Sequence, residues 1–200
     1  MTIEHLLAFN FALFAAIASP GPALLVAIKT TLASGRKAGI AIGCGLATVA
    51  ALWTLTALLG LDVIFDLFPW AYVTVKTAGA IYLLYIAYTM WFNARKDVEP
   101  SQKPKRHAFK QGMMINILNP KAVLFSAAVL VVIFPRDLSF PESMLVVANH
   151  LAVEVLFYAA LAFGMSTKAV SYGYLRAKIY IDRIAAGVLG LLGLKLLTDQ

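Results

Sequence analysis

Three side chains that exchange or orient protons recur every four residues in one apolar segment: His150, Glu154 and Tyr158. This spacing places all three on one face of a helix. Histidine titrates near neutral pH, and an acid inside a membrane segment is usually functional because its burial is costly. The three residues are therefore predicted to form a proton relay, as a secondary exporter requires.

Glu154 also has a simpler interpretation, as one half of an ion pair that fixes helix packing. Lys121 and Lys76 both lie well inside apolar segments and are its candidate partners. A lysine at such a depth costs roughly 2.5–3.5 kcal/mol on insertion scales, so a partner or a cavity is expected. Lys121 would alternatively bind the carboxylate of a substrate. The sequence leaves these interpretations open.

Two apolar segments are interrupted by proline, one in each half of the chain. Proline removes a backbone donor and clashes with the preceding turn, at a cost of about 3 kcal/mol or more. Within lipid the freed carbonyls find no water, so broken helices are tolerated where they line a cavity. Breaks in corresponding positions of two halves indicate a transporter's binding site. The predicted substrate-binding residues are Ser19, Pro20, Gly21 and Pro22 at the first break, and Asn116, Asn119, Pro120 and Lys121 at the second.

The two breaks offer complementary groups to a ligand that carries both charges. A helix restarting near Ala23 would point free amides and a partial positive charge at a carboxylate. The side-chain amides of Asn116 and Asn119, with the carbonyls exposed beside Pro120, would hold an ammonium group. A zwitterionic amino acid fits between them. A plain proline kink is the structural alternative at either break.

The composition places these residues in a membrane. Of 200 residues, 61% are hydrophobic and 14% are charged, and the mean hydropathy is +0.81. Soluble domains have roughly 45–50% apolar and about 25% charged residues. A helical span needs about 20 apolar residues, so the chain has room for about six spans and no soluble domain. We expect an all-α integral membrane protein with a single transmembrane domain over residues 1–200.

The predicted spans cover residues 4–29, 38–61, 67–93, 108–134, 143–167 and 179–198. The N-terminal segment bears Glu4 where a signal peptide would carry a basic residue, so it is interpreted as a retained first helix. Lysine and arginine gather in the first, third and fifth loops. By the positive-inside rule these loops are cytoplasmic and both termini are periplasmic. Membrane topology thus explains the net charge of +7 better than nucleic-acid binding does.

The opposite orientation of the two halves predicts an inverted-topology repeat of two three-helix units. Repeat one covers about residues 1–93, a cytoplasmic linker 94–107, and repeat two 108–200. The third helices also look alike, VKTAGAIYLLYIAYTMW against DRIAAGVLGLLGLKLL. The alternative is that all membrane helices rich in Ala, Gly and Leu look alike. Glycines in the second and sixth spans, with Gly35, Gly39 and Gly43 first among them, predict close helix packing.

Several other functions lack the residues they need. The single cysteine, Cys44, cannot support a redox reaction by paired thiols, and three scattered histidines give no metal-ligand spacing. We therefore expect no enzyme, no metal site and no cofactor. An exporter of another small metabolite or of a metal ion, and a purely structural subunit, are the alternatives. A homo-oligomer is compatible with the sequence.

Three stretches resemble the LysE/RhtB family of amino-acid exporters, in the family's order: SPGPALLVAIKTTLASGRKAGIAIGCGLA, VKTAGAIYLLYIAYTMW and FKQGMMINILNPKAVLF. The resemblance implies a six-helix permease of the bacterial inner membrane that exports amino acids, driven by an ion gradient without ATP. In the family the two proline-containing segments are thought to form the substrate path. By motif match these are the residues predicted above for the two breaks.

This sequence departs from the family pattern in its second helix. Many relatives carry an aspartate after the glycine cluster, whereas the matching stretch here is LATVAALW, with Ala50 near that place. The resemblance therefore implies a neutral or small polar cargo rather than lysine or arginine. Glu154 is the candidate replacement for the missing acid.

Overall fold

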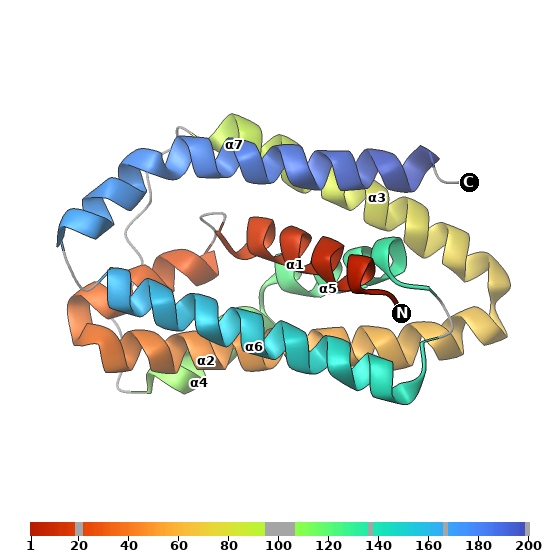
Figure 1. The fold of residues 1–200 in the computed structure, drawn as a ribbon, viewed down its shortest axis with the longest axis horizontal. Helices are drawn as coiled ribbons and strands as arrows, with labels where there is room; N and C mark the ends of the chain where they lie inside the picture. Colours follow the sequence, from red (N-terminus) through yellow and green to blue (C-terminus); the bar gives the residue numbers. More distant parts are fainter. Residues whose placement is uncertain (19–21, 95–106, 136–137, 166–167, 199–200) are drawn as a thin grey trace.

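A computed structural model describes residues 1–18, 22–94, 107–135, 138–165 and 168–198. All regular secondary structure in these ranges is helical, which confirms the prediction of an all-α protein (Figure 1). The helices are α1 (Ile3–Ala18), α2 (Pro22–Leu67), α3 (Pro69–Asn93), α4 (Ala108–Ile117), α5 (Pro120–Ile133), α6 (Phe140–Gly164) and α7 (Lys168–Thr198).

Helix α2 contains the turn between the first two predicted spans. Gly35 has φ 82° and ψ 175°, a backbone conformation that residues with a Cβ rarely adopt. The ribbon doubles back there, and the two arms of α2 lie side by side (Figure 1). A Cβ on Gly39 would collide with the Thr31 hydroxyl, which shows how closely the arms pack. Gly35 therefore forms the turn between the two arms of α2, and the prediction that it packs against another helix is wrong.

The second predicted break separates α4 from α5. The two helices meet at an angle of 62°, around Leu118 and Asn119. At the first break, Ser19, Pro20 and Gly21 lie outside the described residues, and Pro22 opens α2. Each half of the chain thus begins with a short helix followed by a change of direction or a break.

Among the described residues, two helical segments are long and apolar enough to cross a membrane, Ala23–Gly60, which includes the turn at Gly35, and Phe140–Gly164. The bent pair Ala108–Ile117 and Lys121–Ile133 makes a third if it counts as one span. Large apolar side chains also cover the outside of the bundle, for example Leu156 at 68% exposure and Leu191 at 70%. These features support a membrane protein. The six-span count stays a prediction.

The helices form a bundle in which one helix of each broken segment, α1 or α5, lies near the centre, while α4 lies on the outside of α2. Helix α6 runs along α2, and α7 runs along α3, while α1 and α5 lie between these two pairs (Figure 1). Phe9 and Leu13 of α1 and Val129 of α5 are fully or almost fully buried, together with Leu83 of α3 and Leu189 of α7. The pairing of α2 with α6 and of α3 with α7 agrees with the inverted repeat, which remains a prediction.

Glycines bring α2 and α4 into backbone contact. A Cβ on Gly45 would run into the carbonyl oxygen of Phe109, and a Cβ on Gly112 would run into that of Ile42. A Cβ on Gly43 would meet the side chain of Tyr158, so the same stretch of α2 also admits α6. The prediction of close packing at the second-span glycines is confirmed for Gly39, Gly43 and Gly45.

The glycines of α7 behave differently from one another. Gly193 packs against Leu84, where a Cβ would approach Cγ to 3.0 Å. A Cβ on Gly187 would meet nothing within 4 Å, so the packing prediction is wrong for that residue. The spacing of small residues therefore identifies a candidate packing face but not the neighbour it faces.

We expect Gly112→Ala to destabilise the protein by about 1–3 kcal/mol, because the added methyl group overlaps a backbone atom of α2. Gly187→Ala is the matched control, since both changes raise helix propensity equally and only one creates a clash. The measurement is the thermal unfolding midpoint in detergent. Equal midpoints for the two variants would contradict the close contact of α2 and α4.

Candidate functional site

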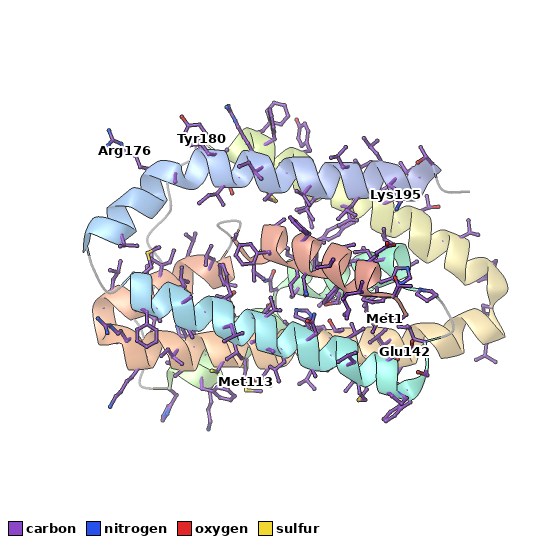
Figure 2. The ribbon with its side chains drawn as sticks, in the orientation of Figure 1. Met1, Met113, Glu142, Arg176, Tyr180 and Lys195 are labelled. Atoms are coloured by element: carbon purple, nitrogen blue, oxygen red, sulfur yellow. The ribbon has the colours of Figure 1, made fainter. Side chains whose placement is uncertain are left out.

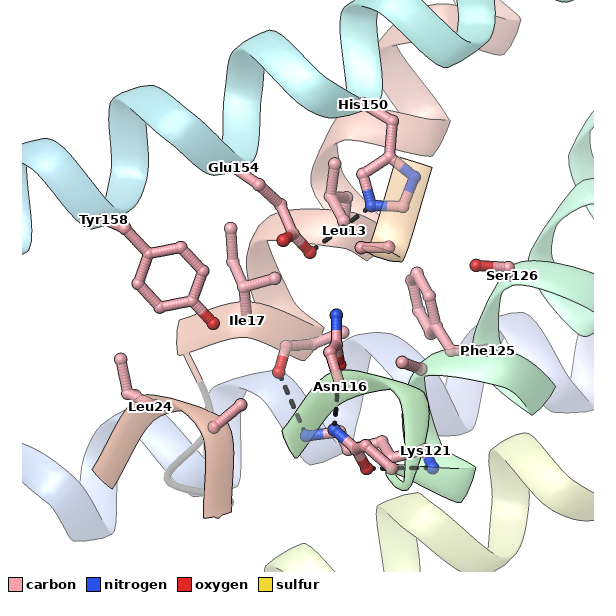
Figure 3. A pocket seen from close by; sticks show the side chains of 15 residues that line it. Leu13, Ile17, Leu24, Asn116, Lys121, Phe125, Ser126, His150, Glu154 and Tyr158 are labelled. Atoms are coloured by element: carbon pink, nitrogen blue, oxygen red, sulfur yellow. Dashed lines mark hydrogen bonds and ion pairs between the residues drawn. The ribbon is translucent and has the colours of Figure 1, made fainter. Parts of the chain in front are cut away.

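A cavity of about 60 Å³ lies where the two broken segments meet α6 (Figure 3). It is bounded by the end of α1, the start and the second arm of α2, the break between α4 and α5, and α6. This volume has room for about four water molecules. The apolar wall consists of Leu13, Ile17, Leu24 and Phe125 with smaller alanines.

The polar wall contains most of the residues predicted for the site. The structure brings together Asn116, Asn119, Lys121, His150, Glu154 and Tyr158, and adds Ser126. The side chains of Pro22 and Pro120 and the whole of Ser19, Pro20 and Gly21 lie outside the described part. The predicted binding roles of these residues remain predictions.

The two asparagines hold the second break together. Asn119 caps α5, because its Oδ1 accepts a hydrogen bond from the Lys121 amide at 3.1 Å. The Asn119 amide group donates to Asn116 Oδ1 at 3.4 Å, and Asn116 Nδ2 donates to the Leu46 carbonyl at 2.7 Å. In this state the amides therefore bond mainly to the protein itself, and they shape the cavity wall.

Lys121 joins the second break to the end of α1. Its Nζ donates to the carbonyl oxygen of Ala16 at 3.0 Å, in the last turn of α1. An ammonium group is favoured there by the partial negative charge of a helix C-terminus. The buried carboxylate of Asp182 on α7 also interacts electrostatically with Lys121. The lysine thus has a partner on two other helices while it still faces the cavity.

Sequence reasoning did not identify Asp182. It lies beside Arg183 near the start of the last predicted span, where an acid and a base look like an ordinary membrane boundary. In the structure α7 begins at Lys168, so Asp182 lies in the middle of the helix and is 4% exposed. Because the predicted span began at residue 179, Asp182 looked like an acid at a helix end. An acid in the middle of an apolar helix would have indicated a functional residue.

The three residues predicted to form a proton relay lie on the buried face of α6. His150, Glu154 and Tyr158 are 1%, 5% and 4% exposed. His150 Nε2 lies 3.3 Å from Glu154 Oε1, and His150 Nδ1 lies 2.7 Å from the Thr54 hydroxyl. Thr54 in turn bonds to the Ser126 hydroxyl at 3.3 Å. A continuous polar chain therefore connects α5 and α2 with the acid on α6.

Thr54 and Ser126 were not predicted as site residues, and the sequence offered no signal for them. Each is a small hydroxyl in an apolar run, of the kind that often bonds only to its own helix, as Thr56 does to the Leu52 carbonyl at 2.9 Å. Their importance arises from helices far apart in the sequence meeting at His150.

The second oxygen of Glu154 has no such partner. Glu154 Oε2 is buried and accepts no hydrogen bond within the described part of the chain. The predicted ion pair with Lys121 is not formed among these residues, since Glu154 pairs with His150 instead. The side chain of Lys76, the other candidate partner, lies outside the part of the chain that the structure describes. Glu154 and Lys121 thus line one cavity as separate charges.

Helix α1 is tied to α6 along its length. The Met1 ammonium group lies 2.6 Å from Glu142 Oε1. Figure 2 labels both residues at the same end of the bundle. Asn149 Nδ2 donates to Asn10 Oδ1 at 2.7 Å, and the Phe9 ring lies edge-on to His150 with centroids 5.5 Å apart. These contacts hold α1 against α6.

Residues 14–200 match the family model of the LysE type translocator. The chain belongs to this family. It is 31% identical to the uncharacterized membrane protein YrhP of Bacillus subtilis (strain 168), over 72% of this chain and 75% of that protein. The uncharacterized membrane protein YahN of Escherichia coli (strain K12) is 24% identical over 90% of this chain and 83% of its own length.

One relative of the chain has a named transport function. The threonine efflux protein of Escherichia coli (strain K12) is 23% identical, over 92% of this chain and 93% of that protein. No solved structure matches the chain. The family resemblance predicted from the proline motifs is confirmed, and the chain is a membrane transporter of the LysE family.

The Thr54–His150 contact is expected to stabilise this LysE-family protein. We expect Thr54→Val to lower stability by about 1–3 kcal/mol, because it leaves buried His150 Nδ1 without its partner. Thr56→Val on the exposed side of α2 is the control, since it removes only a bond within its own helix. Thermal unfolding in detergent measures both. A Thr54→Val protein as stable as the Thr56→Val protein would show that the polar chain is not formed.

Proposed function

We propose that this LysE-family protein exports small neutral or polar amino acids from the cytoplasm across the inner membrane, driven by an ion gradient. The observation that carries the proposal is the cavity itself, which has a cation, Lys121, and an acid, Glu154, in its wall. These two charges complement the carboxylate and the ammonium group of a zwitterion. The wall between them is largely apolar and accommodates a small side chain.

In the proposed binding pose the carboxylate lies near Lys121 and the start of α2. A helix N-terminus favours an anion, and Ala23 and Leu24 of that first turn line the cavity. The remaining residues predicted for the two breaks, from Ser19 to Pro22 and from Asn116 to Pro120, would frame this end of the substrate.

The proposed preference for neutral or polar amino acids follows from the lack of a second acid among the described residues of the cavity wall. Ala50 lines the cavity, near the place where many members of the family carry an aspartate. A second acid there would suit a cationic side chain, and its replacement by alanine removes that attraction. Together with the threonine efflux protein among the relatives, this makes threonine the first cargo to test.

Contacts at the two ends of the molecule support the predicted topology. The Met1 ammonium group pairs with Glu142, so the N-terminus and the loop before α6 share one end. The Arg36 guanidinium lies 5.4 Å from the centroid of the Phe163 ring, which brings the first loop and the end of α6 together. We propose periplasmic termini, six spans in an inverted repeat, and alternating access between the two halves.

We further propose that protons drive export and that His150, Glu154 and Tyr158 relay them. The support is the buried polar chain from Ser126 through Thr54 and His150 to Glu154. Hydroxyl groups both donate and accept hydrogen bonds, so this chain accommodates either tautomer of His150.

The export proposal is tested by feeding cells with threonine-containing dipeptides and measuring extracellular threonine with and without the protein. We expect threonine to appear faster when the protein is made. Lys121→Met should reduce the rate at least about tenfold, because the substrate carboxylate loses a buried cationic partner.

Lys110→Met is the matched control, since Lys110 is exposed on α4 and does not line the cavity. Other dipeptides run in parallel identify the cargo if it is not threonine. If no amino acid accumulates outside although the protein is inserted in the membrane, amino-acid export is wrong.

A further inference from the structure

We propose that the Glu154 carboxylate binds either the ammonium group of the substrate or a proton, and never both. This inference rests on the proposed export function and specifies its coupling. It makes the protein an exchanger in which one proton moves inward for each amino acid that moves outward. The juxtaposition that carries it is a buried, unpartnered carboxylate oxygen at a cavity whose other charged wall group is a lysine.

The two oxygens of Glu154 have different surroundings. Oε1 lies 3.3 Å from His150 Nε2, whereas Oε2 is buried and accepts no hydrogen bond within the described residues. The carboxyl group points from α6 into the cavity (Figure 3). A buried acceptor without a donor is unfavourable and calls for an explanation. A donor that arrives with a ligand, or a proton on the carboxyl group itself, supplies one.

The other described groups around Glu154 do not supply a hydrogen-bond donor to Oε2. On α6, His150 lies one turn before it and Tyr158 one turn after, while α5 contributes Lys121 and Ser126. From α4 comes Asn116, whose amide donates to Leu46 O, and from α2 comes Thr54, which reaches Glu154 only through His150. The facing part of α1 is apolar.

Lys121 is engaged elsewhere. Its Nζ donates to Ala16 O at 3.0 Å, and Asp182 on α7 is its electrostatic partner. Among the described residues that line the cavity, Glu154 is the one acid. A substrate ammonium group that enters the cavity therefore finds one carboxylate among the described wall residues, and one of its oxygens has no hydrogen-bond donor.

Proton and ammonium exclude each other for two reasons. A proton on Oε2 would occupy the direction from which an ammonium N–H would bond. It would also neutralise the carboxylate and remove the attraction between opposite charges, which is strong away from water. The net charge of the cavity differs by one between the two states. A protonated Glu154 leaves the charge of Lys121 unbalanced in the cavity wall, whereas the zwitterion adds no net charge and leaves the ionised Glu154 to balance Lys121.

His150 gives the proton a route to Glu154. Its Nε2 faces Oε1, and its Nδ1 faces Thr54, which continues to Ser126. In the proposed mechanism the substrate bonds to the unpartnered oxygen Oε2 while Oε1 stays in contact with the histidine. The two functions of the acid thus use its two oxygens, and they compete through its charge.

The test measures protons released when the purified wild-type protein binds threonine, or the amino acid that the feeding experiment identifies. A pH-indicator dye in weak buffer reports the release, and calorimetry reports the affinity. We expect protons to be released on binding, up to about one per bound amino acid, and an affinity that falls on acidification.

Two variants on one helix assign the effect. Glu154→Gln should bind without releasing protons and with an affinity that is independent of pH, whereas Glu142→Gln, which alters the acid paired with Met1, should behave as wild type. Glu154→Asp should keep proton release with weaker binding, which covers the case in which Glu154→Gln does not fold or bind.

Each outcome decides the inference separately from the export function. Binding by the wild-type protein without proton release, or release that persists in Glu154→Gln, would overturn the shared site while export stands. Absence of binding and of export for every amino acid would instead overturn the proposed function.

Discussion

The structure depends on one constraint: a helix that breaks inside an apolar bundle must find hydrogen-bond partners for the backbone groups it exposes. At the second break Asn119 caps α5, and Asn116 bonds to the Leu46 carbonyl of α2. Lys121 supplies a donor to the Ala16 carbonyl at the end of α1. Each of these bonds joins the break to itself or to a different helix. The bonding that makes the break tolerable therefore also positions the broken segments around a cavity.

The position of α6 follows from the same arrangement. Gly39 and Gly43 let α6 approach the second arm of α2, so its buried face, with His150, Glu154 and Tyr158, lies opposite the breaks. The result is a small cavity with two charges that do not pair with each other. Lys121 is held by α1 and α7, and Glu154 is held on one oxygen by His150. A site organised in this way is charged at two points before any ligand enters, which reduces the reorganisation that binding requires.

Local signals in the sequence predicted the parts of this arrangement that depend on local chemistry. The second proline break and the shared face of α6 are visible as residue types at fixed spacings. The basic loop between the first two apolar segments indicated the turn at Gly35, although Gly35 itself was predicted to pack helices. What the sequence did not provide was the identity of partners across helices. Asp182 appeared to be a boundary acid, Thr54 and Ser126 appeared to be ordinary hydroxyls, and Asn116 and Asn119 appeared free to bind substrate rather than engaged with the protein. Except for the bonds of Asn119, which are local, these properties depend on packing between segments more than 60 residues apart. The Asn116–Leu46 and Thr54–Ser126 contacts, for example, join residues 70 and 72 positions apart.

The most direct test of the account asks whether the region beside the second break is a water-accessible site that substrate occupies. Cys44 is the single cysteine, so Cys44→Ser provides a background for Ala122→Cys, at the cavity wall, and Leu124→Cys, which is exposed on the outside of the same helix. The measurement is the rate at which a small charged thiol reagent modifies each cysteine, with and without the transported amino acid. The account predicts that Ala122→Cys reacts and is protected by the amino acid, whereas Leu124→Cys, facing lipid, reacts slowly and is not protected. An Ala122→Cys residue that is inert, or that reacts equally with and without the amino acid, would contradict it.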